Sequence, residues 1–306
     1  MIFLQKMQPA LLMILQPASP NSEFMQHNNI IYLKNTRGFS LIEMAVVLLI
    51  VALLLGGLLP TVSSQIEQKN RADTRKQLDE IQQALIGFIV INGRLPCPAS
   101  PTSNGLESFC TTTTPGVCGA EIIPPAILPT HGRCASPYDG FVPAATLGIT
   151  PVDTNGYALD GWSNRIRYAV STVSTSNVYT FTAAPSVMST VGISNLNGDL
   201  NVCASSPNPL TPSQSMTGPP WCGTAASLTS TAPAVIYSTG NNGGYGGNSA
   251  DELANANPYT NPTASPNSYL DKVFVSHDQT PTFDDIVIWI SPNILINKML
   301  SAGKLP

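Results

Sequence analysis

Residues that could carry out catalysis are few in this chain. Its three histidines are His27, His131 and His277, and none of them belongs to an HExxH, GxSxG or P-loop pattern. Serine is so abundant that a Ser/His/Asp set can be drawn almost anywhere, which makes such a set uninformative. We therefore expect His131 and His277 to be solvent-exposed loop histidines, and the protein not to be an enzyme.

Side-chain oxygens that could bind a cation gather in two places. One set alternates around Gly198, which is loosely the pattern of a calcium loop, and the other follows a glycine-rich stretch. The same residue types also favour turns without any metal. Apart from a structural calcium ion, no cofactor is expected. The first set is Asn195, Asn197, Asp199 and Asn201, the second is Asp251 and Glu252, and the candidate calcium ligands among them are Asn197, Asp199, Asp251 and Glu252.

The six cysteines indicate disulfides rather than metal or haem chemistry. No CxxC or CxxCH pattern occurs, the count is even, and an oxidising compartment would pair them. Free buried thiols are the alternative. Of the 15 possible pairings, we favour one loop closed by Cys203 and Cys222, with the other four cysteines paired among themselves. Those four are Cys97, Cys110, Cys118 and Cys134.

Glu43 stands alone in an apolar stretch. It is the only charged residue between Phe39 and Leu59, and a helix of that length can span a bilayer. A carboxylate at mid-membrane costs roughly 2.5–3.5 kcal/mol, so such a residue is usually functional. The alternative is a plain signal anchor with a tolerated acid near the interface.

The order Arg37-Gly38-Phe39-Ser40-Leu41-Ile42-Glu43, with the apolar run that follows, resembles the N-terminus of type IV prepilins and type II secretion pseudopilins. The resemblance implies that a prepilin peptidase cuts between Gly38 and Phe39 and methylates the new amine of Phe39. It also implies that Glu43 pairs with the terminal amine of a neighbouring pilin subunit, and that Pro60 marks a helical segment that can stretch. Major pseudopilins carry a structural calcium site in their C-terminal loops, which favours the calcium hypothesis above.

Four regions follow from this resemblance and from composition. Residues 1–38 form a leader, and Met25 is an alternative start because Met25 to Gly38 gives a leader of more typical length. A short secretory signal around Lys6 is the competing interpretation. Residues 39–60 form the transmembrane half of a long helix, residues 61–92 its soluble half, and residues 93–306 an extracytoplasmic domain. Lys34 and Arg37 would keep the N-terminus in the cytoplasm.

Hydrophobic periodicity predicts the elements around this motif. One helix runs from Phe39 to about Ile91, with a kink or local melting near Gly56, Gly57 and Pro60, and Asn92-Gly93 ends it. Its soluble half should lie on a sheet through one apolar face, formed by Leu78, Ile81, Leu85 and Phe88.

Beyond the helix we expect an α+β domain of the type IV pilin fold, with an antiparallel sheet and disulfide-stapled loops. Residues 178–182 are a plausible partner of the first strand, residues 196–232 form a loop, and a short helix begins with Ser291 as its N-cap and Pro292 as its first residue. Trp162 and Asn164, before the first strand, together with Tyr168 resemble a pattern of major pseudopilins. The predicted strands are 166–170, 233–238, 271–276 and 285–290.

Composition limits the function. Charged residues make up only 10% of the chain and the net charge is −4, so a basic nucleic-acid-binding face has no support. We expect an inner-membrane, single-pass protein with a periplasmic domain, placed among other pilin subunits and membrane lipid, or in an extracellular filament. Its large domain favours a minor subunit of a type IV pilus or a type II secretion pseudopilus. The alternative is a tip-located adhesin or substrate-recognition module.

Overall fold

The computed structural model describes residues 38–114, 117–183, 186–206, 221–243, 249–256 and 272–305, apart from the side chains of residues 56–62 and 186. The predicted leader, with Met25, lies outside these residues except for Gly38. The chain divides into two compact units, Met1–Gly56 and Gly57–Pro306. We describe each by itself.

Helix α1 (Leu41–Asn92) is the longest element and contributes to both units. Its backbone is helical throughout, including at Pro60, so no melted segment interrupts it there. The predicted end is confirmed, because Asn92 Nδ2 donates to the carbonyl of Phe88 at 3.0 Å and Gly93 follows with a φ of +66°. Gly56, Gly57 and Pro60 are described by their backbone alone.

A four-stranded antiparallel sheet forms the centre of the second unit. Its strand order is β11-β9-β4-β3, with β3 (Gly140–Phe141), β4 (Arg167–Val170), β9 (Ala234–Ser238) and β11 (Ile286–Ile290). Val235 lies opposite both Trp289 and Ala169, which fixes the register of the three longer strands. The predicted strands 166–170, 233–238 and 285–290 are confirmed.

A second sheet has three strands in the order β10-β7-β8. It contains β7 (Leu200–Cys203), β8 (Ser227–Ala232) and β10 (Val273–Val275), and β10 runs parallel to β7. This sheet is mixed rather than antiparallel, because the chain crosses from β9 to α4 (Ala250–Ala256) before it returns as β10. The smaller elements are β1 (Phe109–Cys110), β2 (Glu121–Ile122), α2 (Ala144–Leu147), β5 (Ser174–Thr175), β6 (Val178–Tyr179), α3 (Ser186–Val191), η1 (Ile193–Asn195) and α5 (Pro292–Ser301).

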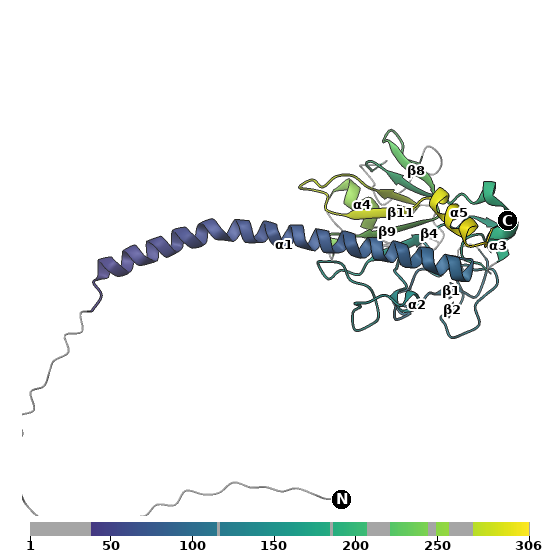
Figure 1. Cartoon of the computed structure of the whole chain (residues 1–306), viewed down its shortest axis with the longest axis horizontal. Helices are drawn as coiled ribbons and strands as arrows, with labels where there is room; N and C mark the ends of the chain where they lie inside the picture. Colours follow the sequence, from purple (N-terminus) through teal and green to yellow (C-terminus); the bar gives the residue numbers. More distant parts are fainter. Residues whose placement is uncertain are drawn as a thin grey trace, which may run out of the picture. The chain divides into compact units, whose positions relative to one another are not determined.

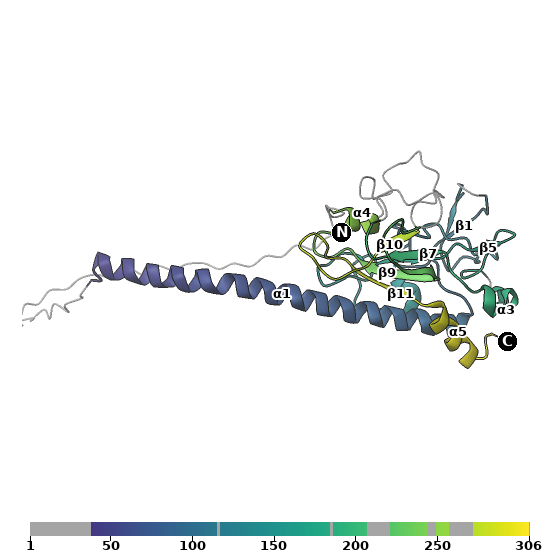
Figure 2. The same cartoon turned by 90° about the horizontal axis from the view of Figure 1, so that it is seen from above.

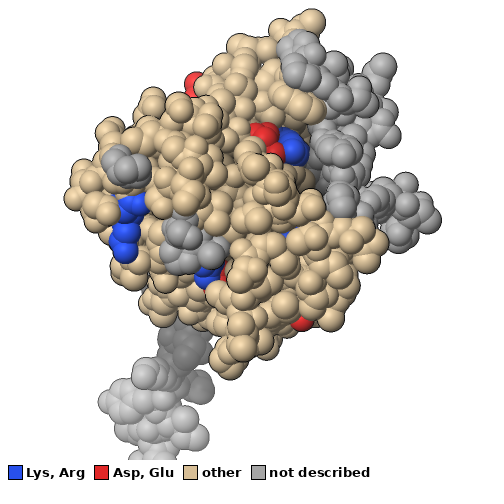
Figure 3. Space-filling model, turned by 90° about the vertical axis from the view of Figure 1, so that its right-hand side faces the viewer, with Lys and Arg blue, Asp and Glu red and all other residues tan. Residues whose placement is uncertain are grey.

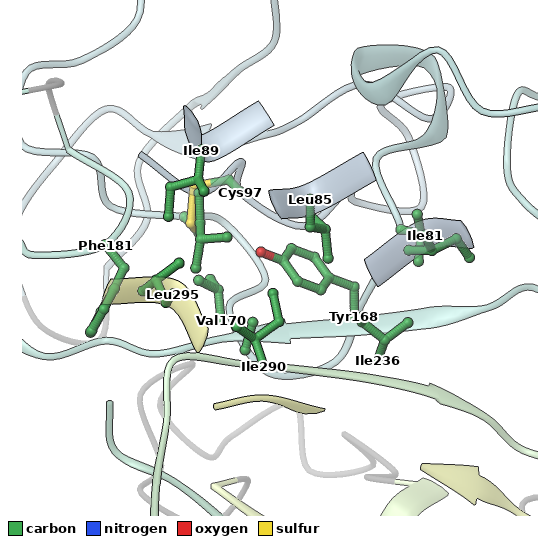
Figure 4. Packing of buried hydrophobic residues seen from close by; sticks show 14 of the residues in the cluster. Ile81, Leu85, Ile89, Cys97, Tyr168, Val170, Phe181, Ile236, Ile290 and Leu295 are labelled. Atoms are coloured by element: carbon green, nitrogen blue, oxygen red, sulfur yellow. A yellow bond between two sulfur atoms is a disulfide. The ribbon is translucent and has the colours of Figure 1, made fainter. Parts of the chain in front are cut away.

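The main core lies between the soluble half of α1 and one face of the four-stranded sheet. Figures 1 and 2 show α1 running along this sheet, with α5 beside the C-terminal end of the helix. Figure 4 shows helix residues such as Leu85 and Ile89 facing sheet residues such as Tyr168 and Ile236. The predicted helical face is confirmed at Leu78, Ile81 and Leu85, which are fully buried.

Phe88 was placed on that face wrongly. The buried position is Ile89, whereas Phe88 is half-buried and its ring lies 5.2 Å from the guanidinium of Arg94. The helix turns by 100° per residue, so the stripe drifts from Leu85 to Ile89 and leaves Phe88 at its border.

The opposite face of the four-stranded sheet packs on the second sheet. Val235, Tyr237 and Val287 from the first sheet meet Val202 and Phe274 from the second, and the rings of Tyr237 and Phe274 lie 5.2 Å apart. Both faces of β9 and β11 are therefore covered, which explains why these strands read as continuous apolar runs rather than as alternating ones.

Two sequence predictions for the domain were wrong. Residues 178–182 do not pair with the first strand: β6 pairs with β5 in a small hairpin, and β4 lies between β9 and β3. The expected loop 196–232 contains the strands β7 and β8. Its central part, 207–220, lies outside the described residues. The short C-terminal helix is confirmed as α5, although its N-cap residue Ser291 makes no side-chain capping bond.

The surface reflects the low charge of the sequence. Figure 3 shows one face on which Lys, Arg, Asp and Glu cover only small, scattered areas. Several ionic groups are instead in the interior of the domain. Arg94 and Glu107, for example, form a buried bidentate pair with two contacts of 2.7 Å.

Candidate functional site

Ser40 and Glu43 form a reciprocal capping box at the start of α1. The backbone N–H of Ser40 donates to Glu43 Oε2 at 2.8 Å, and the N–H of Glu43 donates to Ser40 Oγ at 3.2 Å. This S-x-x-E arrangement satisfies two backbone donors that a helix N-terminus otherwise leaves free. Glu43 therefore has a local structural role that the sequence analysis did not assign to it.

Within its described residues, the first unit exposes all of its large apolar side chains. Phe39 is 82% exposed and Leu41 88% exposed, and eleven further large apolar residues up to Leu55 are also exposed. A surface of this size indicates a site that an apolar partner covers. Within the described residues, no helix includes a segment both long and apolar enough to cross a membrane. The predicted span 39–59 continues into positions whose side chains are not described.

Gly38 is not required by the fold. A Cβ added to it would meet nothing within 4 Å, and its backbone is not in the left-handed region. Any need for glycine at this position must therefore come from something other than the chain's own packing.

Comparison with known proteins identifies this segment. Residues 33–59 match the family model of the prokaryotic N-terminal methylation motif. The chain carries a prepilin-type cleavage and methylation motif. The methylation motif is consistent with the type IV pilin and pseudopilin family, whose members are structural subunits and not enzymes. No curated protein and no solved structure matches the chain.

The methylation motif implies processing by a prepilin peptidase and assembly with other pilins. Of the residues predicted for these steps, Gly38, Phe39 and Glu43 lie together at the start of the described chain. Pro60 belongs to the helical backbone of α1, and its side chain is not described.

In the second unit, a loop before β4 fixes the soluble half of α1 to the domain. Gly161 lies so close to the helix that a Cβ on it would approach the Asn70 carbonyl oxygen to 2.3 Å. The N–H of Gly161 donates to Thr74 Oγ1 at 2.9 Å, and Trp162 Nε1 donates to Glu67 Oε2 at 3.0 Å. The pattern of Trp162 and Asn164 pointed to this loop, but not to its contact with α1.

All six cysteines are paired. The bonds are Cys97–Cys134, Cys110–Cys118 and Cys203–Cys222, so the expected loop is present and the other four cysteines pair among themselves. Cys97–Cys134 lies in the main core, and Cys203–Cys222 packs with Trp221 and Val273 at the end of the second sheet.

The first candidate calcium set is not arranged around a common point. Asn197 is exposed and donates to the carbonyl of Ser194, whereas Asp199 forms an ion pair with Lys272. Asp199 also accepts hydrogen bonds from the hydroxyls of Ser171 and Thr172. An ammonium group already occupies the place that a cation would take, so Asn197 and Asp199 are poor calcium ligands.

Of the second set, Asp251 and Glu252 turn in different directions from α4. Asp251 accepts from the N–H of Ser206 at 2.5 Å and lies 3.2 Å from His277 Nε2. Glu252 is 3% exposed and meets Asp284 and Asp285, and one carboxylate oxygen from each of the three lies within 4.8 Å of the others.

In the acidic cluster formed by Glu252, Asp284 and Asp285, the surroundings disfavour ionised carboxylates. Burial, helped by the neighbouring carboxylates Glu252 and Asp284, raises the pKa of Asp285 to about 8, against a hydrogen bond from Asn255 that lowers it. Burial also raises the pKa of Asp284. Two buried acceptor atoms at the cluster, Asp284 Oδ1 and Asn242 Oδ1, have no hydrogen-bond partner within the described residues.

The two loop histidines are not simply exposed, contrary to expectation. The ring of His277 stacks on Phe283 at 3.9 Å, and the side chain is 24% exposed beside Asp251. His131 accepts from the N–H of Arg133 through Nδ1, and burial lowers its pKa. His277 is held by a residue that is distant in sequence, Asp251, and His131 by a backbone contact within its own turn.

Proposed function

We propose that this chain is a structural subunit, of the minor pilin or pseudopilin kind, of a type IV pilus or type II secretion pseudopilus. The observation that carries the proposal is the exposed apolar helix surface that lies within the methylation motif and contains one acid. Before assembly this surface lies in the inner membrane, with the domain in the periplasm. In the filament, the helices of neighbouring subunits cover it.

Cleavage takes place between Gly38 and Phe39. Nothing in the fold demands glycine at position 38, so its role is recognition by the peptidase. A Gly38→Ala variant should remain as an uncleaved, longer precursor in a gel or mass spectrum. A mature-sized product from that variant would contradict the cut site.

Cleavage creates an amine at Phe39 next to an apolar helix. In lipid, an isolated charge is costly, and pairing it with a carboxylate offsets part of that cost for both groups. Glu43 is the only carboxylate in the segment, and it pairs with the amine of a neighbouring subunit, which sets the step between subunits.

The capping box offers a competing explanation for Glu43, and one substitution separates the two. In Glu43→Gln the side-chain oxygen can still accept from the Ser40 N–H, so the helix cap remains, but the charge is lost. We expect Glu43→Gln to be inserted and cleaved normally yet to enter filaments poorly. In a matched control, Ser40→Ala removes the hydroxyl of the box and leaves the charge, and it should assemble.

The readout is the fraction of mature subunit in sheared filaments relative to the membrane fraction. Normal incorporation of Glu43→Gln together with failure of Ser40→Ala would show that capping, and not charge pairing, is the role of Glu43. Normal incorporation of both variants would remove Glu43 from assembly altogether.

We also propose a structural calcium ion, held by Glu252 together with Asp284 and Asp285. The residues fit such an ion, because calcium prefers carboxylate and amide oxygens and the cluster offers two buried acceptors without a partner. Bound calcium would neutralise the carboxylates and fix the β9–α4 connection against the residues before β11. Isothermal titration without a calcium heat at pH 8 would remove this proposal.

A further inference from the structure

A pocket of about 240 Å³ opens between the β5–β6 hairpin and the end of the second sheet. None of its lining residues belongs to the methylation motif. One wall is built from residues that hydrogen bonds and disulfides hold in place. The other is built from hairpin side chains that form no hydrogen bond with the residues that the structure describes. This division is typical of a site in which fixed groups orient a ligand and the ligand forms hydrogen bonds with the hairpin side chains.

The firm wall carries two positive charges and an aromatic ring. Arg133 is 4% exposed, and its Nη1 donates to the carbonyls of Thr112, Thr114 and Val117. Lys272 pairs with Asp199, and its Nζ lies 5.8 Å from the centre of the Tyr138 ring.

Two disulfides hold this wall in place. Cys118 and Cys134 both line the pocket, and each is bonded to a cysteine outside its lining. A wall restrained in this way loses little conformational freedom when a ligand binds.

The hairpin supplies polar groups that are available for binding. Ser174, Asn177 and Tyr179 line the pocket, and within the described part of the chain their side chains form no hydrogen bond. Ser176 and Asn177 both have positive φ values, 52° and 62°, which closes the hairpin in a tight turn and presents these side chains from one short element. Burial raises the pKa of Tyr179, and the nearby Arg133 guanidinium opposes part of this rise, so the two side chains share one environment.

The chemistry of the lining limits the ligand. Arg133 and Lys272 line the pocket and no Asp or Glu does, although the protein as a whole is acidic. Asp199 pairs with Lys272, so the net positive charge of the lining comes from Arg133. An anionic group is therefore favoured. The volume is below the roughly 300–1,000 Å³ of pockets for drug-sized ligands, so the pocket takes about one ring. Hydroxyl and amide groups suit ring hydroxyls, and tyrosine rings suit an apolar ring face.

We propose that this pocket binds one acidic sugar unit, with its carboxylate toward Arg133 and Lys272 and its hydroxyls toward the hairpin. A subunit with such a site would contact anionic polysaccharide. The inference does not depend on the position of the chain in a filament, because every residue it uses belongs to the domain.

The test is titration of the detergent-solubilised full chain with glucuronate, glucose, acetate and sulfate, followed by ligand-observed NMR. We expect glucuronate to bind in the millimolar range, with glucose and acetate each at least fivefold weaker. Equal binding of glucose would contradict the anionic part of the proposal. Equal binding of acetate or sulfate would contradict the sugar part, and no binding of glucuronate would overturn both.

Two variants place the ligand in this pocket. Asn177→Gly keeps the left-handed backbone and removes the amide, and Tyr179→Ala removes the ring and the hydroxyl. Each should weaken glucuronate binding about 2- to 10-fold, while the melting temperature stays close to that of the wild type. Lys298→Gln, an exposed charge change on α5, is the control and should bind as the wild type does. Unchanged binding in both pocket variants would exclude this pocket.

Discussion

Replacing Asp285 by asparagine should flatten the pH dependence of stability that the acidic cluster creates. Asp285 is 7% exposed, and burial together with its acidic neighbours raises its pKa to about 8 in the folded chain. In the unfolded chain an aspartate titrates near about 3.9. The folded state therefore prefers the protonated carboxyl, and this contribution to stability is complete below about pH 4 and lost as pH rises toward 8.

The magnitude follows from the same shift. Between pH 5 and 7.5 the folded state should lose about 3 kcal/mol through this group, at about 1.4 kcal/mol per pH unit. For a domain of this size, that corresponds to a fall in melting temperature of roughly 6–12 °C. Asp285→Asn cannot ionise, so its melting temperature should exceed that of the wild type at pH 7.5 and match it more closely at pH 5.

Other groups also titrate in this range, so the difference between the two proteins is the quantity to measure. Burial raises the pKa of Asp139 and Asp160 in the same direction, whereas the lowered pKa of His131 acts in the opposite sense below about pH 6.5. These contributions are common to the wild type and the variant. Asp278→Asn is the matched control, because Asp278 is exposed and should leave the pH profile unchanged.

Calcium should offset most of this loss of stability in the wild type. Binding requires deprotonated carboxylates, so calcium at 100 times the Kd that applies at pH 7.5 should stabilise the wild type by about 2.7 kcal/mol at pH 7.5, and by less at pH 5. Asp285→Asn should lose most of this gain. The assay is thermal unfolding by circular dichroism in EDTA and in calcium. Parallel pH profiles for the wild type and Asp285→Asn in EDTA would refute the assignment of the raised pKa, and a calcium gain retained in full by the variant would refute the ligand set.

Two further predictions concern the domain. Gly161→Ala should lower stability by about 1–3 kcal/mol in denaturant titration, because the new methyl group would meet the backbone of Asn70, whereas Gly87→Ala, at an exposed helical position with open space, should raise it by about 0.5–1 kcal/mol. Equal effects at the two glycines would exclude the close approach. Replacing Cys203 and Cys222 together by serine should cost about 3 kcal/mol through the lost loop closure, and an unchanged unfolding midpoint would show that this disulfide does not form.

The sequence predicted those parts of the fold whose signal is local. The strands β9 and β11 are continuous apolar runs, and α1 shows helical periodicity and a clear Asn92-Gly93 end. β8 escaped prediction because Ser227–Ala232 consists mainly of serine and threonine, whose alternation does not separate a buried face from an exposed one. Phe181 misled the prediction of a partner strand, since it reaches the core from a turn after β6.

The candidate sites also divide into those with a local signal in the sequence and those without one. The methylation motif is contiguous, so Gly38, Phe39 and Glu43 could be found directly. Glu252 was found through its neighbour Asp251, but its actual partners Asp284 and Asp285 lie more than 30 residues further along. Asp199 was misjudged because its partner Lys272 is 73 residues away. Spacing in sequence does not reveal such convergence, which depends on how α4 and the strands pack.

The two functions of α1 place different demands on its two halves. Before position 56 its apolar side chains are exposed, and in the function proposed above they exchange one apolar environment for another during assembly. After position 62 the helix is fixed to the domain by buried leucine and isoleucine side chains, by Gly161 and Trp162, and by the bond from Gln82 Nε2 to the Trp289 carbonyl at 3.0 Å. A force applied to the first half during assembly would therefore act on a second half held at several separate points. For this reason we expect substitutions at Glu43 to impair incorporation without destabilising the domain, and substitutions at Gly161 to destabilise the domain without changing cleavage at Gly38.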